Sequence, residues 1–478
     1  MTADGGPALR ATSLPELGPG RYRRRLETVV IVATFGGILF GYDTGVINGA
    51  LEPMARELGL TAVTEGLVTS LLQLGAAVGA TTVGVLVDRL GRRRTLLSLS
   101  WVFVIGTLGC SLAPGFGVLL AARFVLGLAV GGASVTVPIY LSELAPTEWR
   151  GRISARNDVA VCLGQLLAFT LNALIAHYFG DHESVWRYMI AVAMIPAFML
   201  FAGMLRTPES PRWLMAQGRV EASLAVLKQI RPAGRATAEH QEIAELMRAE
   251  AHAGVIEVSE TLKASWVKRL ILIGAGLAVI QQLTGINAIM YYGTALLETA
   301  GFGGETAIIA NIANGVLSVL GMLAGLKLIS HFPRRKMLLF GLAWITVMHL
   351  LIAAAAALLP EGIVKAVAIM ILVVAFVGVM QACLGLVVWV VLGEMFPLRV
   401  RGVAMGLGAL CNWLGNAAVA FSFPSLMALI GIRGTFLIFA ALNVAGFIFV
   451  NRLVPETGDR SLEQLENDFA SEGIVVRR

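Results

Sequence analysis

Two ionisable side chains, Asp43 and Arg123, lie deep within apolar stretches of the sequence, where charge is costly. Asp43 lies in a stretch that begins near residue 28 and is long enough to cross a bilayer. An aspartate near the centre of a spanning helix costs about 2.5 to 3.5 kcal/mol on insertion scales, so such residues usually mark a path for ions or substrate. A carboxylate there can bind and release a proton, and a neighbouring guanidinium would tune its proton affinity.

The two side chains are also expected at the same depth. The first stretch ends near Ala50 and the stretch with Arg123 begins near Gly117, so at about 1.5 Å per residue Asp43 and Arg123 lie about 10 and 9 Å from the same face. We therefore expect them to meet and to act as a proton-coupling pair. The alternative is a structural aspartate that stays paired to an arginine.

A second polar group consists of the amides Gln281, Gln282 and Asn287, with Gly285 between them. Neutral amides donate and accept hydrogen bonds, as an uncharged ligand with many hydroxyls requires. On an unbroken helix Asn287 would point about 120 to 140° away from the glutamines. A break at Gly285 would let the three amides converge, as in the binding helices of transporters. The alternative is that the amides join neighbouring helices.

The elements that carry these residues are predicted to be transmembrane helices. Of the 478 residues, 57% are hydrophobic and 14% are charged, whereas about 25% charged is usual in soluble proteins. The pattern predicts an all-α membrane protein with twelve transmembrane helices. The apolar stretches lie near 28–50, 66–87, 95–113, 117–139, 157–178, 187–205, 269–292, 306–328, 337–358, 364–392, 403–430 and 434–453.

Basic residues gather in alternate connecting segments, which the positive-inside rule places in the cytoplasm. These segments include Arg23, Arg92 and Arg334, and the segments on the other side hold few basic residues. We therefore expect a multi-pass protein of the cell membrane with both termini in the cytoplasm. Membrane orientation accounts for the net charge of +6, so no nucleic-acid partner is expected.

The chain divides into five predicted parts. Residues 1–27 and 454–478 are cytoplasmic tails, 28–206 and 268–453 are six-helix halves, and 207–267 is a polar cytoplasmic linker with short helices. An enzyme is not expected, because the sequence has no metal-ligand cluster, nucleophile arrangement or phosphate-binding loop. No cofactor and no metal are expected either.

Charged motifs recur at matching places in the two halves. Glu143-x-x-Pro-x-x-x-Arg150-Gly returns as Glu394-x-x-Pro-x-x-x-Arg401-Gly. Such repeats indicate duplicated halves, between which transporters bind their substrate. Ion pairs at the helix ends would break as the halves rock, and the alternative is plain positive-inside anchoring. The expected gating residues are Asp88, Arg92, Arg93, Glu143, Arg150, Glu394 and Arg401.

The second copy of the loop motif is altered. Asp88-Arg-Leu-Gly-Arg92-Arg93 follows the second stretch, and Ser330-His-Phe-Pro333-Arg-Arg follows the eighth. Ser330 and Pro333 replace the acid and the glycine, so weaker closure contacts are expected in the C-terminal half.

Taken together, these motifs resemble those of the sugar porter family of the major facilitator superfamily, over about residues 28–465. The resemblance rests on Gly41-Tyr-Asp-Thr44, the loop motif after residue 87, Pro208-Glu-Ser-Pro-Arg-Trp213, Gln281-Gln-Leu-Thr-Gly-Ile-Asn287, and Pro455-Glu-Thr457. Within the family the chain is similar to bacterial proton-linked hexose, pentose and myo-inositol importers. The resemblance implies two pseudo-symmetric six-helix halves.

The resemblance also implies roles for single residues. Asp43 corresponds to the proton site of the family and Arg123 to its partner. Facilitative relatives carry asparagine in place of Asp43, so an aspartate there favours symport. Met380 and Leu386 depart from the family pattern, which leaves the exact sugar open. The positions that match substrate contacts or the outer gate are Phe40, Gln165, Gln281, Gln282, Asn287, Tyr291, Tyr292, Asn314, Gly385, Trp389 and Asn412.

The function expected from these observations is proton-coupled import of a neutral monosaccharide or cyclic polyol, such as glucose or myo-inositol, by alternating access. The partners would be the sugar, protons and the lipid bilayer, with the monomer as the working unit. The alternatives are a proton-independent facilitator, a membrane sensor that binds sugar without transporting it, and a drug antiporter of the same superfamily.

Overall fold

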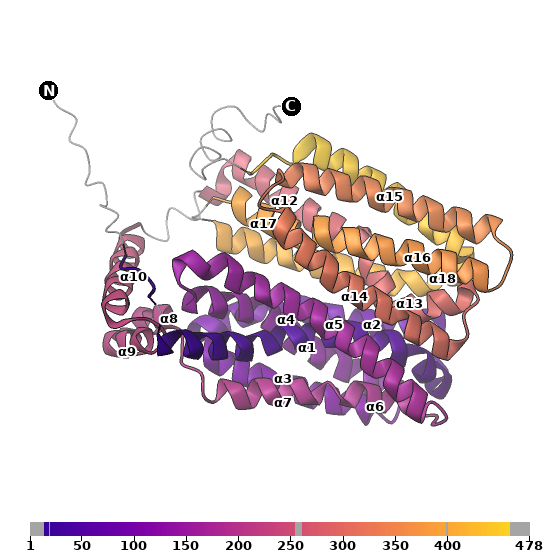
Figure 1. Ribbon diagram of the computed structural model, residues 1–478, viewed down its shortest axis with the longest axis horizontal. Coiled ribbons are helices and arrows are strands. Elements are labelled where there is room, and N and C mark those ends of the chain that lie inside the picture. Colours follow the sequence, from indigo (N-terminus) through magenta and orange to yellow (C-terminus); the bar gives the residue numbers. More distant parts are fainter. Residues whose placement is uncertain (1–13, 19, 254–260, 398–399, 459–478) are drawn as a thin grey trace.

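The computed structural model describes residues 14–18, 20–253, 261–397 and 400–458 (Figure 1). In this part of the chain every regular element is helical, which confirms the predicted all-α fold. The predicted tails lie mostly outside the described residues. Figure 1 shows two helical layers side by side, with the N-terminal half below and the C-terminal half above.

The N-terminal half contains long helices that match the predicted apolar stretches but extend beyond them. Its helices are α1 (Arg21–Leu58), α2 (Ala62–Leu90), α3 (Arg92–Ser111), α4 (Phe116–Leu144), the 3₁₀ turn η1 (Thr147–Trp149), α5 (Arg150–Phe179), α6 (Val185–Ala191) and α7 (Met194–Met204). Asp88 and Glu143, expected to follow helices, therefore lie within the last turns of α2 and α4.

The described part of the linker is mainly helical and contains α8 (Pro211–Ala216), α9 (Val220–Ile230) and α10 (Ala233–Ala253). They lie together at one end of the molecule, called here the linker end (Figure 1). Arg235 contacts Glu148 at 2.9 Å and Glu239 at 2.6 Å, and Arg231 contacts Glu239 at 2.9 Å. Burial lowers the pKa of Arg231, and the Glu239 carboxylate opposes this shift. This ionic cluster attaches the linker to the N-terminal half.

The C-terminal half repeats the arrangement, with one span interrupted at Gly285 and another at the π-helical turn η2. Its helices are α12 (Ser265–Leu283), α13 (Ile286–Ala300), α14 (Gly304–Leu328), α15 (Arg334–Leu358), α16 (Ile363–Met380), the π-helical turn η2 (Gln381–Gly385), α17 (Val387–Met395) and α18 (Arg401–Leu453).

The count of membrane spans agrees with the sequence. Eleven helical segments of the described residues are long and apolar enough to cross a membrane. The last of them, Arg401–Leu453, has 53 residues and contains Gly431 at φ 65° and ψ −175°, which is not helical. Because the chain bends there, α18 provides two spans, and the total is twelve.

Close helix packing positions the site residues of α1 and α5. A Cβ on Gly41 would lie 1.8 Å from the Val161 carbonyl, and one on Gly164 would lie 2.3 Å from the Ile38 carbonyl. Only glycine permits this approach, and it holds α1, which carries Phe40 and Asp43, directly against the part of α5 that carries Gln165.

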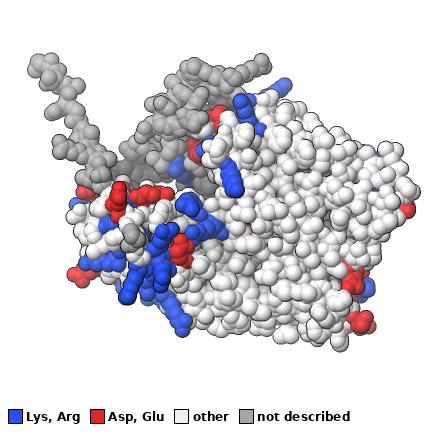
Figure 2. Space-filling view, in the orientation of Figure 1, with Lys and Arg blue, Asp and Glu red and all other residues white. Residues whose placement is uncertain are grey.

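Charge is distributed as a membrane protein requires. Figure 2 shows lysine and arginine gathered at the linker end, and a middle band of the visible surface that is almost free of charge. Many large apolar side chains are exposed along the spans, such as Ile105, Leu272 and Ile371. This surface suits contact with lipid tails.

Candidate functional site

Asp43 on α1 and Arg123 on α4 meet inside the N-terminal half. Arg123 Nη1 lies 3.4 Å from Asp43 Oδ1, and the two side chains are 1% and 5% exposed respectively. Arg123 Nε also donates to the Val68 carbonyl of α2 at 3.2 Å. The two residues therefore lie at the same depth, as the helix rise predicts. Their role in proton coupling stays a prediction.

The predicted helix break occurs at Gly285. Helix α12 ends at Leu283, α13 begins at Ile286, and Gly285 between them has φ 81°. The break turns Asn287 back toward the preceding helix, where its Nδ2 donates to Gln282 Oε1 at 2.5 Å. Two of the three predicted amides are thus in direct contact.

Gln281 faces a different set of partners. Its Nε2 donates to the carbonyls of Leu384 and Gly385 at 3.2 and 3.3 Å, and its Oε1 accepts from Asn412 Nδ2 at 2.9 Å. These carbonyls are available because the π turn η2 interrupts the helix at this point. Gly385 therefore contributes backbone to the site. Trp389 follows one turn later, half-buried in α17.

Two further predicted residues lie on either side of the interface between the halves. Gln165 of α5 accepts a hydrogen bond at 3.0 Å from Ser318 of α14, which in turn accepts from Gln381 Nε2 at 2.8 Å. Asn314 of α14 donates to Asn311 at 2.9 Å, and its own Oδ1 is buried without a partner among the described residues. A buried acceptor left free in this way suits a ligand hydroxyl.

Aromatic rings lie on both sides of the amides. The rings of Phe40 and Trp413 lie 5.4 Å apart. The Tyr291 hydroxyl accepts from Asn416 Nδ2 at 3.0 Å, and the Tyr292 hydroxyl donates to the Ala420 carbonyl at 2.6 Å.

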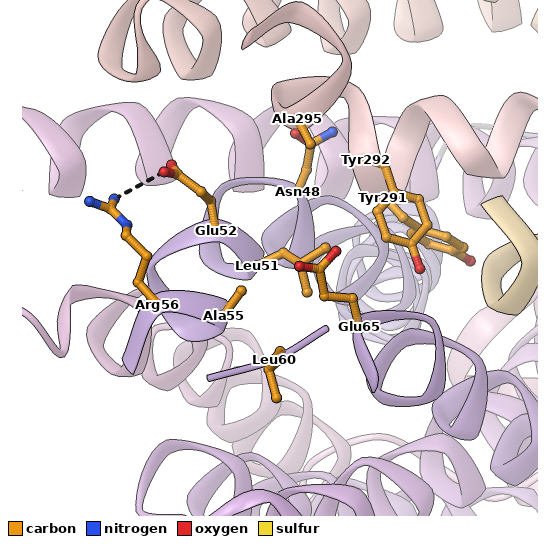
Figure 3. A pocket seen from close by; sticks show the side chains of 10 residues that line it. All are labelled: Asn48, Leu51, Glu52, Ala55, Arg56, Leu60, Glu65, Tyr291, Tyr292 and Ala295. Atoms are coloured by element: carbon orange, nitrogen blue, oxygen red, sulfur yellow. Dashed lines mark ion pairs between the residues drawn. The ribbon is translucent and has the colours of Figure 1, made fainter. Parts of the chain in front are cut away.

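Beyond the tyrosines lies a cavity of about 240 Å³, called here the outer cavity (Figure 3). Helix α1 starts at the linker end and its last turns line the cavity, which therefore lies toward the opposite end of the molecule (Figure 1). Its lining residues come from α1, α2, α13 and the segment between α1 and α2: Asn48, Leu51, Glu52, Ala55, Arg56, Leu60, Glu65, Tyr291, Tyr292 and Ala295. Tyr291 and Tyr292, which are 1% and 2% exposed, form its inner wall.

Sequence reasoning missed several polar residues of this region. Asn48 of α1 donates to the Met290 carbonyl at 2.9 Å and accepts from Thr294 at 2.5 Å. Asn416 donates to Gln73 Oε1 at 3.3 Å and thereby joins α18 to α2. One signal was present, because Asn412 and Asn416 are four residues apart and share a helix face. The other missed residues are Ser318, Gln381 and Trp413.

The predicted gating residues lie at the linker end, but the pairs differ between the halves. Arg92 binds Glu143 through two contacts of 2.9 Å, whereas Asp88, with a side chain that is 76% exposed, lies 3.4 Å from Arg92. Arg93 donates to the backbone carbonyls of Met204 and Leu205 at 2.9 and 2.7 Å.

In the second half Arg334 makes a single contact of 3.4 Å with Glu394. Ser330 bonds locally to the Lys327 carbonyl at 2.8 Å. Arg401 donates to the Phe396 carbonyl at 3.2 Å. Its counterpart in the first half, Arg150, has a buried Nε without a hydrogen-bond partner among the described residues. Arg334 and Glu394 therefore share fewer contacts than Arg92 and Glu143 do. The weaker closure expected from Ser330 and Pro333 stays a prediction.

Comparisons with known proteins agree with this geometry. The family model described as "Sugar (and other) transporter" matches residues 29–469. The chain is 48% identical to the major myo-inositol transporter IolT of Bacillus subtilis (strain 168), over 93% of this chain and 94% of that protein. The inward-open xylose transporter XylE from E. coli superposes with a TM-score of 0.80 and 27% identity, over 92% and 99% of the two chains. A second structure, described as the proton:xylose symporter XylE bound to 6-bromo-6-deoxy-D-glucose, superposes with a TM-score of 0.77 and 28% identity, over 93% and 99%.

Proposed function

Since the chain belongs to the sugar transporter family, we propose that it carries a neutral monosaccharide or cyclic polyol across the cell membrane together with a proton. The family model covers most of the sequence, which confirms the resemblance found from the motifs. The chain is accordingly a transporter and not an enzyme.

The observation that carries the proposal is the buried Asp43–Arg123 pair beside an uncharged binding region. Gln281, Gln282, Asn287 and Asn412 contribute amides from the three helices α12, α13 and α18, and neutral amides suit neutral hydroxyls. A charged substrate would need a counter-charge among them. A neutral substrate needs no such counter-charge, so the Asp43 carboxyl stays free to bind a proton.

Myo-inositol is the first substrate to test, because IolT is a myo-inositol transporter. Glucose and xylose come next. A cyclic polyol presents hydroxyls around its whole ring, so it can satisfy amides on both sides. The unpartnered Oδ1 atoms of Asn314 and Asn416 add two acceptors for such a ligand.

The contacts between the halves support alternating access. Asn48 with Thr294, Asn416 with Gln73, and the His177 ring 2.8 Å from Glu305 join the halves at or toward the end with the outer cavity. We infer that this end faces the outside and is closed in this structure, and that the linker end faces the cytoplasm. The agreement with inward-open XylE fits this assignment. Both termini would then be cytoplasmic.

We further infer that the monomer is the working unit, because one chain supplies the ion pair, the amides and both halves of the pathway. Lipid would surround the charge-free middle band (Figure 2).

The test is uptake in proteoliposomes. The purified protein is supplied with labelled myo-inositol, glucose or xylose, with and without an imposed proton gradient. Accumulation only with the gradient supports symport. Equilibration without accumulation would make the protein a facilitator, and saturable binding without flux would make it a sensor.

A further inference from the structure

Glu65 is a carboxylate of the outer cavity that none of the roles above uses. It lies near the start of α2 and lines the cavity together with Glu52, Arg56 and Tyr291 (Figure 3). Its side chain has no hydrogen bond or ion pair with any described residue. Glu52, by contrast, lies 3.3 Å from Arg56. Glu65 is thus half-buried, ionisable and unpaired.

Glu65 lies close to the coupling pair. Val68, whose carbonyl accepts from Arg123 Nε at 3.2 Å, follows Glu65 by three residues, which is a rise of about 4.5 Å. Glu65 also interacts with Tyr292, and Tyr291 interacts with the charges of Asp43 and Arg123. Tyr291 and Tyr292 thus lie near both Glu65 and the coupling pair.

The other ionisable groups around Glu65 are engaged elsewhere. On α1, Glu52 and Arg56 bind each other. On α13, Tyr292 donates to a backbone carbonyl, and Glu298, which is not among the residues that line the cavity, lies near Glu52 beside Gly304. On α18, the nearest chain to Gly66 is Phe421, which has no titratable group. Arg123 of α4 is paired with Asp43. Glu65 is the carboxylate in this cavity that no arginine neutralises.

We propose that Glu65 takes up the transported proton from the outer solution and passes it to Asp43 when Tyr291 and Tyr292 move aside. The Glu65 O–H bond breaks, the proton travels through solvent of the cavity, and a new O–H bond forms on an Asp43 oxygen. Glu65 is left ionised and ready for the next proton, and Asp43 becomes neutral. The inference rests on the proposed proton symport and adds a residue to it.

The physical reason is access. Asp43 is only 4% exposed, so it exchanges protons slowly with bulk water in this state. A carboxylate in an open cavity exchanges them quickly and holds one close to the gate. Glu65 would therefore set the rate of proton loading without contacting the sugar.

The test compares Glu65→Gln with the matched variant Glu52→Gln, which changes a paired carboxylate of the same cavity. Full-length proteins in proteoliposomes are assayed for uptake driven by a pH gradient at low external buffer. Glu65→Gln should lower the initial rate of uptake about tenfold. This loss is smaller than the contribution of a positioned acid to a chemical reaction, because other steps of transport are also slow. Glu52→Gln should keep most of the rate.

Two measurements separate proton delivery from a structural role. Sugar counterflow without a gradient should be unchanged in Glu65→Gln, since it needs no proton loading. Adding a membrane-impermeant buffer such as MES outside should restore proton-driven uptake, because the buffer replaces the missing carboxyl. Glu65→Asp, which keeps the carboxyl, should resemble the wild type.

Wild-type rates in Glu65→Gln at low buffer would overturn the inference, as would an equal loss of counterflow or the absence of rescue by MES. In each of these cases the proposed symport survives, provided that the wild type accumulates sugar with the gradient. If the wild type does not respond to the gradient, the proposed function and this inference fail together.

Discussion

Glu209 and Glu456 occupy equivalent positions in the two halves of the protein. The Glu209 carboxylate accepts the backbone N–H groups of Arg92 and Arg93 at 2.9 and 3.1 Å, at the start of α3. Glu456 accepts those of Arg334 and Arg335 at 3.0 and 3.1 Å, at the start of α15. Each acid caps a helix N-terminus, where unpaired N–H groups favour negative charge. The repeated Pro-Glu motifs of the sequence thus tie the segment after each half to its third span.

Because the two caps match, the ion pairs beside them, Arg92–Glu143 and Arg334–Glu394, can be compared directly. Glu143 has two contacts of 2.9 Å with Arg92, and both side chains are 12% exposed. Glu394 has one contact of 3.4 Å with Arg334, and both are more exposed. We expect Glu143→Gln to destabilise the protein by about 3 kcal/mol, because it leaves a mostly buried arginine with only the exposed Asp88 as a counter-charge.

Glu394→Gln is the matched variant and should cost less than about 1 kcal/mol, as for an exposed pair. Thermal unfolding in detergent measures both. Equal losses of stability in the two variants would contradict this difference between the halves.

Asp43→Asn tests proton coupling. The amide keeps the size of the side chain but cannot release a proton, so it should resemble a permanently neutral site. Sugar binding and counterflow should persist, because the amides of α12 and α13 are untouched. Accumulation driven by a pH gradient should disappear. Gradient-driven accumulation by this variant would make Asp43 a structural partner of Arg123 and would favour the facilitator.

Gln282→Ala tests the binding amides. Removing a hydrogen bond to a buried ligand costs about 1 to 3 kcal/mol, which corresponds to an affinity about tenfold weaker or more. A binding titration on the purified variant measures this. Asn443→Ala is the control, since Asn443 is a buried amide that donates to the Phe439 carbonyl within α18 and should leave affinity unchanged. An unaltered affinity in Gln282→Ala would remove this residue from the site.

Gly285→Ala tests the helix break. At φ 81° a side chain costs about 1 to 2 kcal/mol, and its Cβ would lie 3.3 Å from the Phe439 ring. The variant should relax toward a straighter helix, move Asn287 away from Gln282, and weaken substrate binding. Gly301→Ala imposes similar strain at φ 119° at the other end of α13, so it should lower stability without lowering affinity. Equal affinities in the two variants would show that the break does not shape the site.

Much of the site was predictable because it depends on local regularities. The apolar stretches predicted twelve spans, since a span needs about twenty apolar residues. The constant rise of a helix placed Asp43 and Arg123 at one depth, and a glycine among three amides marked the break at Gly285. These properties depend on short segments, so they could be read from residue types and spacing.

The partners of each side chain were decided only by the tertiary structure. The sequence grouped Gln281 with Gln282, but the fold gives Gln281 to Asn412 and the π turn, and gives Gln282 to Asn287. Likewise Asn416 reaches Gln73 and Tyr291, and Glu65 comes to face the cavity beside them. Such contacts join helices that are far apart in the chain. They depend on how those helices pack and rotate against one another, and no local pattern encodes that rotation.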